Sequence, residues 1–394
     1  EGELKLLQED VMKDLLEEAY EKADPKFLSL VECYASGKSD DEIRDMVYKL
    51  YQAAMSHPYP EEWLEECMEV YRVQTIEELR ETSWIQLLWE TLDEKLDQAE
   101  ALTESARKIC NEPDGPYFYD EALVDDLNFW REVRRCRETK DYDKVADILS
   151  GHTFAKLSAK RDSSIDPVKK EQAKELRDEE KEICKDLSTK FFNQKEEILL
   201  ELIACAREPL EGLVELTLQF KEAFSSKKRE KNLLDFTDME HFALRILVEK
   251  VDGELIPTQA ARELSEKYEE VMVDEYQDSN FVQELITTMV SGWVEKRKNI
   301  FMVGDVKQSI YRFRLARPEL FMEKYHSYSL EDSEEQRIDL HKNFRSRAEV
   351  LTSVNYIFRQ IMGEDLGGIT YDDDNALYPG ASFPEGADPE FTRT

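Results

Sequence analysis

Three short segments in the second half of this sequence carry residue types that could do chemistry together. The first is Val271-Met-Val-Asp-Glu-Tyr-Gln-Asp-Ser-Asn280, an apolar run that ends in two carboxylates. At the end of a strand, Asp274 could hold Mg²⁺ through water and Glu275 could polarise an attacking water, the arrangement called Walker B. The alternative is that both acids cap a helix predicted from about Phe281.

The second segment is Phe301-Met-Val-Gly-Asp-Val-Lys-Gln-Ser-Ile-Tyr-Arg-Phe-Arg-Leu-Ala316. Gln308 stands 34 residues after Asp274, which leaves room for one helix and a return strand. Adjacent parallel strands would bring both side chains to one sheet edge, where ligands of open α/β sheets bind. The segment also contains an aromatic and cationic cluster, Tyr311, Phe313 and Arg314. This cluster could stack on unpaired bases and contact phosphates. Equally, Phe313 could be core and the arginines a solvated face.

The third segment is Ile338-Asp-Leu-His-Lys-Asn-Phe-Arg-Ser-Arg347, another strand-like run followed by a polar turn and a helix. An arginine in such a turn could reach a phosphate across a domain boundary, as an arginine finger does. Taken alone, this segment is equally compatible with a surface arginine.

Two different patterns of apolar residues along the chain predict the elements that must position these residues. Residues 1 to about 222 show apolar side chains at helical spacing, with a predicted break near Pro209. After Ser225, short apolar runs alternate with helical segments, which favours buried strands in a parallel α/β sheet. The predicted strands are Val271–Val273, Ile300–Val303 and Ile338–Leu340.

Composition limits the classes of protein that fit. The chain has 394 residues and a formal charge of −35, which predicts more than one domain and argues against a nucleic-acid protein. Charge is uneven, however: residues 1–100 hold 27 acids and 10 basic residues, whereas Lys296 to Arg317 holds seven basic residues and one acid. The segment that could stack on unpaired bases is therefore locally basic.

Cysteine spacing and hydropathy exclude two further classes. The six cysteines are at least 21 residues apart, so there is no CxxC-type zinc motif, and a reduced, cytoplasmic protein is expected. No apolar run approaches the roughly 18 residues of a membrane span, so no membrane partner is expected.

Taken together, the three segments resemble helicase motifs II, III and IV of the UvrD/Rep group of superfamily 1, in order and in spacing. Further stretches resemble the AddA branch of that group, which comprises the A-type subunits of ATP-dependent helicase/nucleases. These stretches are Tyr311–Phe321, Leu234–Glu240 and, more loosely, Ser56–Pro60.

The resemblance implies roles for individual residues. Asp274 would hold Mg²⁺, Glu275 would activate water, and Phe344 would stack on the adenine of ATP. Gln308 and Arg345 match the γ-phosphate sensors. Contacts to single-stranded DNA are implied for Tyr311, Arg312, Phe313 and Arg314. Many relatives have Trp in place of Phe313 and Gly in place of Leu315.

The resemblance also implies ATP and Mg²⁺ as cofactors. The implied partners are single- and double-stranded DNA and an AddB-type subunit. The implied activity is 3′–5′ unwinding of double-strand ends for recombinational repair, with an exonuclease elsewhere in the polypeptide. Two alternatives remain. One is a UvrD/Rep- or RecB-like helicase without the AddA role, and the other is a non-enzymatic acidic helical scaffold.

A phosphate-binding Walker A motif, GxxxxGK[ST], is missing from the sequence. The nearest match, Gly37-Lys38-Ser39, has Glu32 in place of the first glycine and follows a helical pattern, so Ser39 is interpreted as a helix cap. We therefore expect a fragment that is inactive by itself, with an α/β fold: part of a RecA-like P-loop NTPase sheet and a large all-helical accessory domain. The expected domains are a first-motor remnant (1–20), the helical domain (21–224), the rest of the first motor domain (225–337) and the start of a second (338–394).

Overall fold

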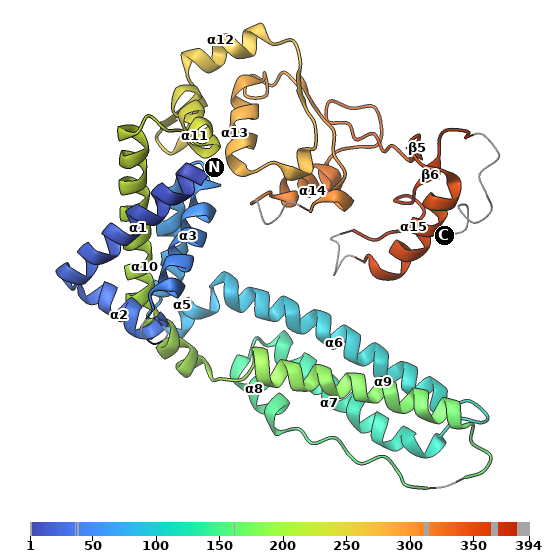
Figure 1. Ribbon diagram of the computed structural model, residues 1–394. Coiled ribbons are helices and arrows are strands. Elements are labelled where there is room, and N and C mark those ends of the chain that lie inside the picture. Colours follow the sequence, from blue (N-terminus) through green and yellow to red (C-terminus); the bar gives the residue numbers. More distant parts are fainter. Residues whose placement is uncertain are drawn as a thin grey trace. The chain divides into compact units, whose positions relative to one another are not determined.

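The computed structural model describes residues 2–35, 37, 39–160, 162–310, 315–363 and 369–383, and in these it is mostly helical with short strands (Figure 1). Contacts divide the chain into two compact units. The helical unit comprises Ala19–Ile43 and Glu65–Glu215. The α/β unit comprises Glu1–Glu18, Arg44–Leu64 and Leu216–Thr394.

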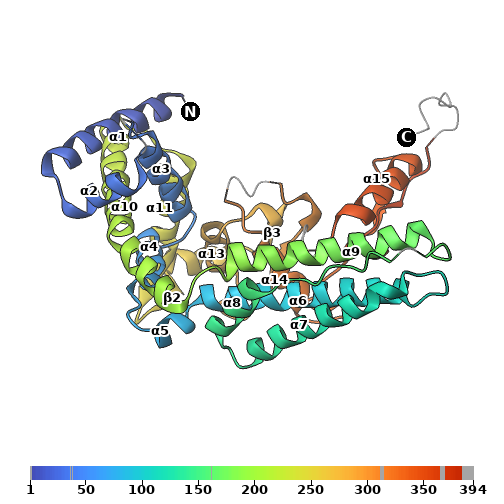
Figure 2. The ribbon, with the colours of Figure 1, turned by 90° about the horizontal axis from the view of Figure 1, so that it is seen from below.

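The helical unit is built on long amphipathic helices that lie alongside one another in both views (Figure 1, Figure 2). On the longest of them, apolar side chains three, four or seven residues apart, including Leu92, Leu96 and Ala99, are completely buried. Its helices are α2 (Pro25–Tyr34), α5 (Ile76–Arg80), α6 (Ser83–Cys110), α7 (Asp120–Glu138), α8 (Tyr142–Gly151) and α9 (Pro167–Asp186).

A buried polar cluster lies inside this helical unit. The Arg177 guanidinium donates to both carboxylate oxygens of Asp126, at 2.6 and 3.0 Å, and Glu180 Oε1 accepts from Trp130 Nε1 at 2.6 Å. All three charged residues are at most 1% exposed. Burial and the neighbouring Asp126 raise the pKa of Glu180 to about 7.

Several helices have residues in both units: α1 (Gly2–Lys22), α3 (Asp41–Met55), α4 (Pro60–Glu69) and α10 (Glu196–Glu230). The predicted break near Pro209 is wrong, because α10 continues through this residue. A proline deprives the carbonyl four residues earlier of its donor, and here that residue is the exposed Cys205, where water can take the place of the amide. Close packing follows one turn later, since a Cβ on Gly212 would lie 2.4 Å from the Lys26 carbonyl oxygen.

The α/β unit carries helices around small sheets. Its further helices are α11 (Phe236–Leu247), α12 (Gln259–Lys267), α13 (Phe281–Val290), α14 (Pro318–Ser327) and α15 (Ala348–Ile361). At the start of α3, Ser39 Oγ accepts from the Asp41 amide at 3.2 Å. The helix then packs on the second half of α10 through Tyr51, whose ring meets Phe220 and Phe224 edge-on. Because of this packing, Arg44–Leu64 groups with the α/β unit and not with the helical residues around it.

Two strands form the parallel pair predicted from the sequence. β3 (Val271–Val273) pairs in parallel with β4 (Ile300–Met302), and Met272 is opposite Phe301. The predicted burial of these strands is wrong among the described residues, since Met272 is 71% and Phe301 56% exposed. The pair is therefore covered mainly on one side.

Other strands differ from the prediction. An antiparallel hairpin that was not predicted from the sequence joins β1 (Val248–Val251) to β2 (Glu254–Pro257). Ile338–Leu340 is not a strand. Instead β5 (Lys342–Asn343) pairs in parallel with β6 (Tyr378–Pro379). In the described part of the chain, no helix is both long and apolar enough to cross a membrane.

Candidate active site

Of the three segments predicted to carry chemistry, the first two meet at one edge of the β3–β4 pair. Because the strands are parallel, their carboxyl ends point the same way, and Asp274-Glu275 follows β3 where Gly304-Asp305 follows β4. The ladder continues past the strands, as the Tyr276 amide donates to the Val303 carbonyl at 2.9 Å. This edge therefore gathers Asp274, Glu275 and Gln308 in one place.

A sharp turn presents the two carboxylates to solvent. Glu275 has φ 50° and ψ 44°, the left-handed region, and its amide donates to Asp274 Oδ1 at 2.9 Å. For a residue with a Cβ this conformation costs about 1–2 kcal/mol. Both side chains are exposed. The strained turn therefore directs both carboxylates into solvent. Apolar packing does not explain this arrangement, because neither side chain is buried.

A chain of hydrogen bonds joins the two strand ends. Gln277 Nε2 donates to Glu275 Oε2 at 2.7 Å, and Gln277 Oε1 accepts from the Asp305 amide at 3.0 Å. Asp305 Oδ2 in turn accepts from Gln308 Nε2 at 3.0 Å. Glu275 and Gln308 are thereby connected through two intermediate residues, Gln277 and Asp305.

Gln277 was not among the residues predicted from the sequence. It is only 1% exposed, and its amide bridges the two loops. Gly304 makes room for it: a Cβ at this position would lie 2.6 Å from Gln277 Oε1 and 2.9 Å from the Phe321 ring. A glycine directly after the predicted strand Ile300–Val303 was the available signal, because it marks close approach of another group.

The loop acids differ in their ionisation. Burial alone would raise the pKa of Asp305, but hydrogen bonds from Lys307 and Gln308 hold it below its ordinary value. Burial, and to a lesser extent the charge of Glu275, raise the pKa of Asp278. Asp305 is therefore kept as an anion that can orient Gln308.

Helices behind this edge hold the loop in place. The buried Tyr276 hydroxyl donates to Glu284 on α13, and Lys324 on α14 pairs with the same carboxylate at 2.8 Å. The Lys324 ammonium also lies 5.1 Å from the centre of the Tyr276 ring. These contacts fix the polypeptide immediately after Glu275.

The third segment contributes a separate turn. Asn343 Oδ1 accepts from the amides of Arg345 and Ser346 at 2.9 and 2.8 Å, which fixes the turn after β5. Phe344 is 67% exposed, and its ring lies against Gly380. Across the described residues, no hydrogen bond or ion pair joins Arg345 to the β3–β4 edge.

The DNA-contact residues predicted from the sequence, Tyr311, Arg312, Phe313 and Arg314, lie outside the described residues. Directly after them, Leu315 has φ 64°, a left-handed conformation that glycine adopts at lower cost. A glycine at this position, which the resemblance implies for many relatives, would relieve that strain.

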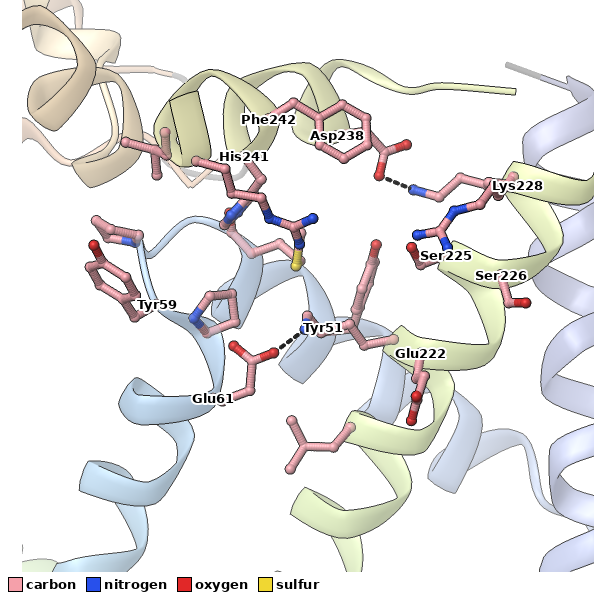
Figure 3. Close-up of a pocket in the computed structure, with 18 of the residues that line it drawn as sticks. Tyr51, Tyr59, Glu61, Glu222, Ser225, Ser226, Lys228, Asp238, His241 and Phe242 are labelled. Atoms are coloured by element: carbon pink, nitrogen blue, oxygen red, sulfur yellow. Dashed lines mark hydrogen bonds and ion pairs between the residues drawn. The ribbon is translucent and has the colours of Figure 1, made fainter. Parts of the chain in front are cut away.

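A cavity of about 890 Å³ lies elsewhere in the α/β unit, lined by residues of α3, the loop after it, the start of α4, α10, α11 and β1 (Figure 3). Its cations are largely paired: the buried Lys228 donates to Asp238 at 2.6 Å and to Asp235 at 2.8 Å. Lys221 pairs with Glu61 in the same cavity. These closed pairs make it a poorer candidate for an anionic ligand than the strand edge.

The donor groups at the strand edge suit one kind of metal ion. In the part of the chain that the structure describes, no three His, Cys, Asp or Glu side chains gather as a metal cluster. Mg²⁺ does not require one, because it keeps several waters and binds one or two carboxylates together with substrate phosphates. The exposed Asp274 carboxylate at the end of β3 fits that kind of site.

Comparison with known proteins gives the class to which this fold and edge belong. The model of the UvrD/REP helicase N-terminal domain matches residues 4–329, and the chain belongs to that family.

Individual relatives narrow the family to one branch. The chain is 48% identical over 387 residues to the A-type subunit of the ATP-dependent helicase/nuclease of Lachnoclostridium phytofermentans, covering 98% of this chain and 28% of the relative. It is 40% identical to the same-named proteins of Bacillus pumilus and Clostridium perfringens, covering 98% and 97% of this chain and 31% and 30% of those proteins. The chain thus spans less than a third of these relatives, and its resemblance to the AddA branch is confirmed.

Proposed function

We propose that this chain is part of an AddA-type, ATP-dependent DNA helicase/nuclease that unwinds and processes double-strand DNA ends. The observation that carries the proposal is the hydrogen-bonded connection from Glu275 through Gln277 and Asp305 to Gln308, at the carboxyl edge of two parallel strands. Ligands of open α/β sheets bind at such edges. Relatives named as ATP-dependent helicase/nuclease subunits favour this reading over a plain UvrD/Rep- or RecB-like helicase.

Each side chain at this edge has a role in ATP hydrolysis under the proposal. Asp274 would hold Mg²⁺, which when bound neutralises charge on the phosphates. Glu275 accepts a proton from the attacking water, and Gln277 fixes the carboxylate oxygen that is not accepting it. Gln308, oriented by Asp305, donates its amide toward the terminal phosphate.

The third segment would complete the nucleotide site from a second motor domain. Arg345 supplies a positive charge for the terminal phosphate, and the exposed ring of Phe344 offers a face for adenine. In this scheme residues 225–337 belong to a first RecA-like motor domain, 338–394 begin the second, and 21–224 form the helical accessory domain, except for Arg44–Leu64 and the residues from Leu216, which group with the α/β unit.

DNA would be contacted by the basic segment that includes Tyr311, Arg312, Phe313 and Arg314. Stacking on its aromatic residues and pairing of its arginines with phosphates would bind single strands. An AddB-type partner, a nuclease domain in the same protein and a cytoplasmic location are parts of the same proposal.

The test is an assay of the complete protein encoded by the gene. We expect Mg²⁺-dependent ATP turnover that rises when single-stranded DNA is added, and ATP-driven strand separation from a duplex end. Turnover without unwinding, with the AddB-type partner present, would contradict the helicase role. No turnover at all would contradict the whole proposal.

A further inference from the structure

The loop between α3 and α4 contains a histidine that the proposed function does not use. The His57 ring lies between two aromatic rings of the α/β unit. It stacks on Trp63 with ring centres 4.4 Å apart and planes 15° apart, and it meets Phe281 at 5.0 Å and 37°. His57 therefore bridges the loop after α3 and the first residue of α13.

The same histidine contacts the residue that closes the basic segment. His57 Nε2 lies 3.4 Å from Arg317 Nη2, and the Arg317 guanidinium lies 5.3 Å from the centre of the Phe281 ring. The Arg317 amide donates to the Ser279 carbonyl at 2.8 Å. Arg317 is thus bonded through its backbone to the turn that follows the Asp274-Glu275 pair, and its side chain lies against the first residue of α13.

The protonation of His57 suits it to accept this hydrogen bond. Burial, together with the charge of Arg317, lowers the pKa of His57 to about 4. The imidazole is therefore neutral near pH 7. With its hydrogen on Nδ1, the Nε2 lone pair faces the guanidinium as an acceptor.

The loop that carries His57 is held in place by contacts of its own, so it can support Arg317. His241 Nε2 on α11 donates to the Met55 carbonyl at 2.9 Å. Further along the loop, the Lys250 ammonium lies 5.0 Å from the centre of the Tyr59 ring, and Lys250 pairs with Glu62. Contacts before and after His57 in the sequence therefore hold its ring against Phe281, the first residue of α13.

We propose that His57 is a positioning residue that couples DNA binding to ATP hydrolysis, by holding Arg317 against the start of α13. Arg317 lies three residues after the proposed DNA contact Arg314 and is bonded to the loop of the strand-end carboxylates. Under this inference, a shift of Arg317 on DNA binding reaches the loop after β3 through its bond to Ser279. The inference rests on the proposed function and adds to it a residue with no contact of its own to ATP.

The experiment compares two substitutions in the complete protein. His57→Phe keeps an aromatic ring between Trp63 and Phe281 but removes the acceptor, whereas His57→Gln keeps an acceptor and loses the ring. Each variant is assayed for ATP turnover without DNA and for the single-stranded DNA concentration that half-maximally stimulates turnover. His326→Phe, at an exposed histidine on α14, is the matched control.

For His57→Phe we expect the half-maximal DNA concentration to rise about five- to tenfold, because the lost hydrogen bond involves a charged partner. Turnover without DNA should stay within about twofold of the unmodified protein. His57→Gln and His326→Phe should both leave the DNA dependence near its starting value.

An unchanged DNA dependence in His57→Phe would overturn the inference. It would also be overturned if both His57 variants were equally impaired, or if turnover with and without DNA fell together, since either result indicates packing alone. Turnover that DNA does not stimulate in the unmodified protein refutes the coupling while leaving ATP hydrolysis intact. Absence of any turnover refutes the proposed function itself.

Discussion

Each unit of the chain contains a group of charged side chains, and the two groups are arranged in opposite ways. In the helical unit, Asp126, Arg177 and Glu180 are buried, and the ion pair between the first two is closed in the unit's interior. In the α/β unit, Asp274 and Glu275 are exposed at a strained turn. The buried Asp126 and Arg177 neutralise each other within the protein, whereas Asp274 and Glu275 present their carboxylates to solvent, where a ligand can reach them.

The contrast shows how charge can be assigned to stability or to chemistry. A buried ion pair contributes little net stability but is costly to break, because its remaining partner is left desolvated. Exposed carboxylates on a strained turn contribute nothing obvious to folding, and their orientation requires another explanation. Substitutions in the two groups should therefore have separable effects.

The largest expected effect is on turnover. In the complete protein, Glu275→Gln should lower kcat for ATP by about 10²–10⁴-fold, because the amide cannot accept the proton but still accepts the hydrogen bond from Gln277. Thermal unfolding should be unchanged. Glu334→Gln, at another exposed acid, is the control. A kcat within a factor of three of the unmodified protein would remove Glu275 from the catalytic role.

Breaking the buried pair should give the reverse pattern. Arg177→Ala should lower local stability by about 3–5 kcal/mol, since Asp126 is left buried and unpaired. Amide hydrogen exchange in α7 and α9 measures this loss, and kcat at low temperature should be unaffected. The double variant Asp126→Leu, Arg177→Met should recover most of the stability. A loss below about 1 kcal/mol would show that the pair is not as closed as its geometry indicates.

The pH dependence of stability should come from Glu180. Its pKa is 4.5 in the unfolded reference and about 7 in the fold, so the folded state binds more protons between these values. The stability that Glu180 contributes is therefore fully present below pH 4.5 and is lost as pH rises toward 7, by on the order of 3 kcal/mol. Burial and Asp126 raise the pKa, while the hydrogen bond from Trp130 and the charge of Arg177 oppose them.

Glu180→Gln should flatten this decline and increase stability at pH 8, because the amide keeps an acceptor for Trp130 and carries no charge. Urea unfolding at pH 5 and pH 8, followed by tryptophan fluorescence, gives the comparison. Equal pH slopes in the variant and the unmodified protein would show that another group titrates.

The smallest expected effect concerns strain beside the exposed edge. Leu315→Gly should change stability by about +1 kcal/mol or less, since relief of the left-handed conformation is partly offset by the greater freedom of glycine when unfolded. The urea midpoint measures it. Leu330→Gly, at an exposed leucine without positive φ, should be destabilising instead. Destabilisation by Leu315→Gly would indicate that the leucine side chain packs productively.

Much of the strand edge could be predicted from sequence, because the relevant signals are local. Val271–Val273 and Ile300–Val303 are short apolar runs followed by polar residues, and the spacing between Asp274 and Gln308 allows one return strand. Parallel pairing follows from that spacing, and the structure contains it. The helical run before residue 222 was equally clear, since apolar spacing near 3.6 residues is repeated over many turns.

Features that depend on distant packing could not be predicted in this way. Pro209 predicted a break, but α10 continues through it and packs closely on α2 at Gly212. Ile338–Leu340 has strand-like composition, yet the pairing partner at Tyr378–Pro379 selects Lys342–Asn343 instead. Gln277 carries no sequence mark of its own, because its role exists only when the second strand lies beside the first. The β1–β2 hairpin is a different case. It could have been predicted, because its turn signal, Asp252-Gly253, is local and strong.

The close approach of Gly304 to Gln277 has an evolutionary consequence. A side chain at position 304 would occupy the space of the Gln277 amide, so neither position can change freely while the other is kept. Among homologous proteins the two positions should therefore vary together. A lineage that acquired a larger residue at position 304 would also need a smaller side chain at position 277. It would then need another way to connect its two strand ends.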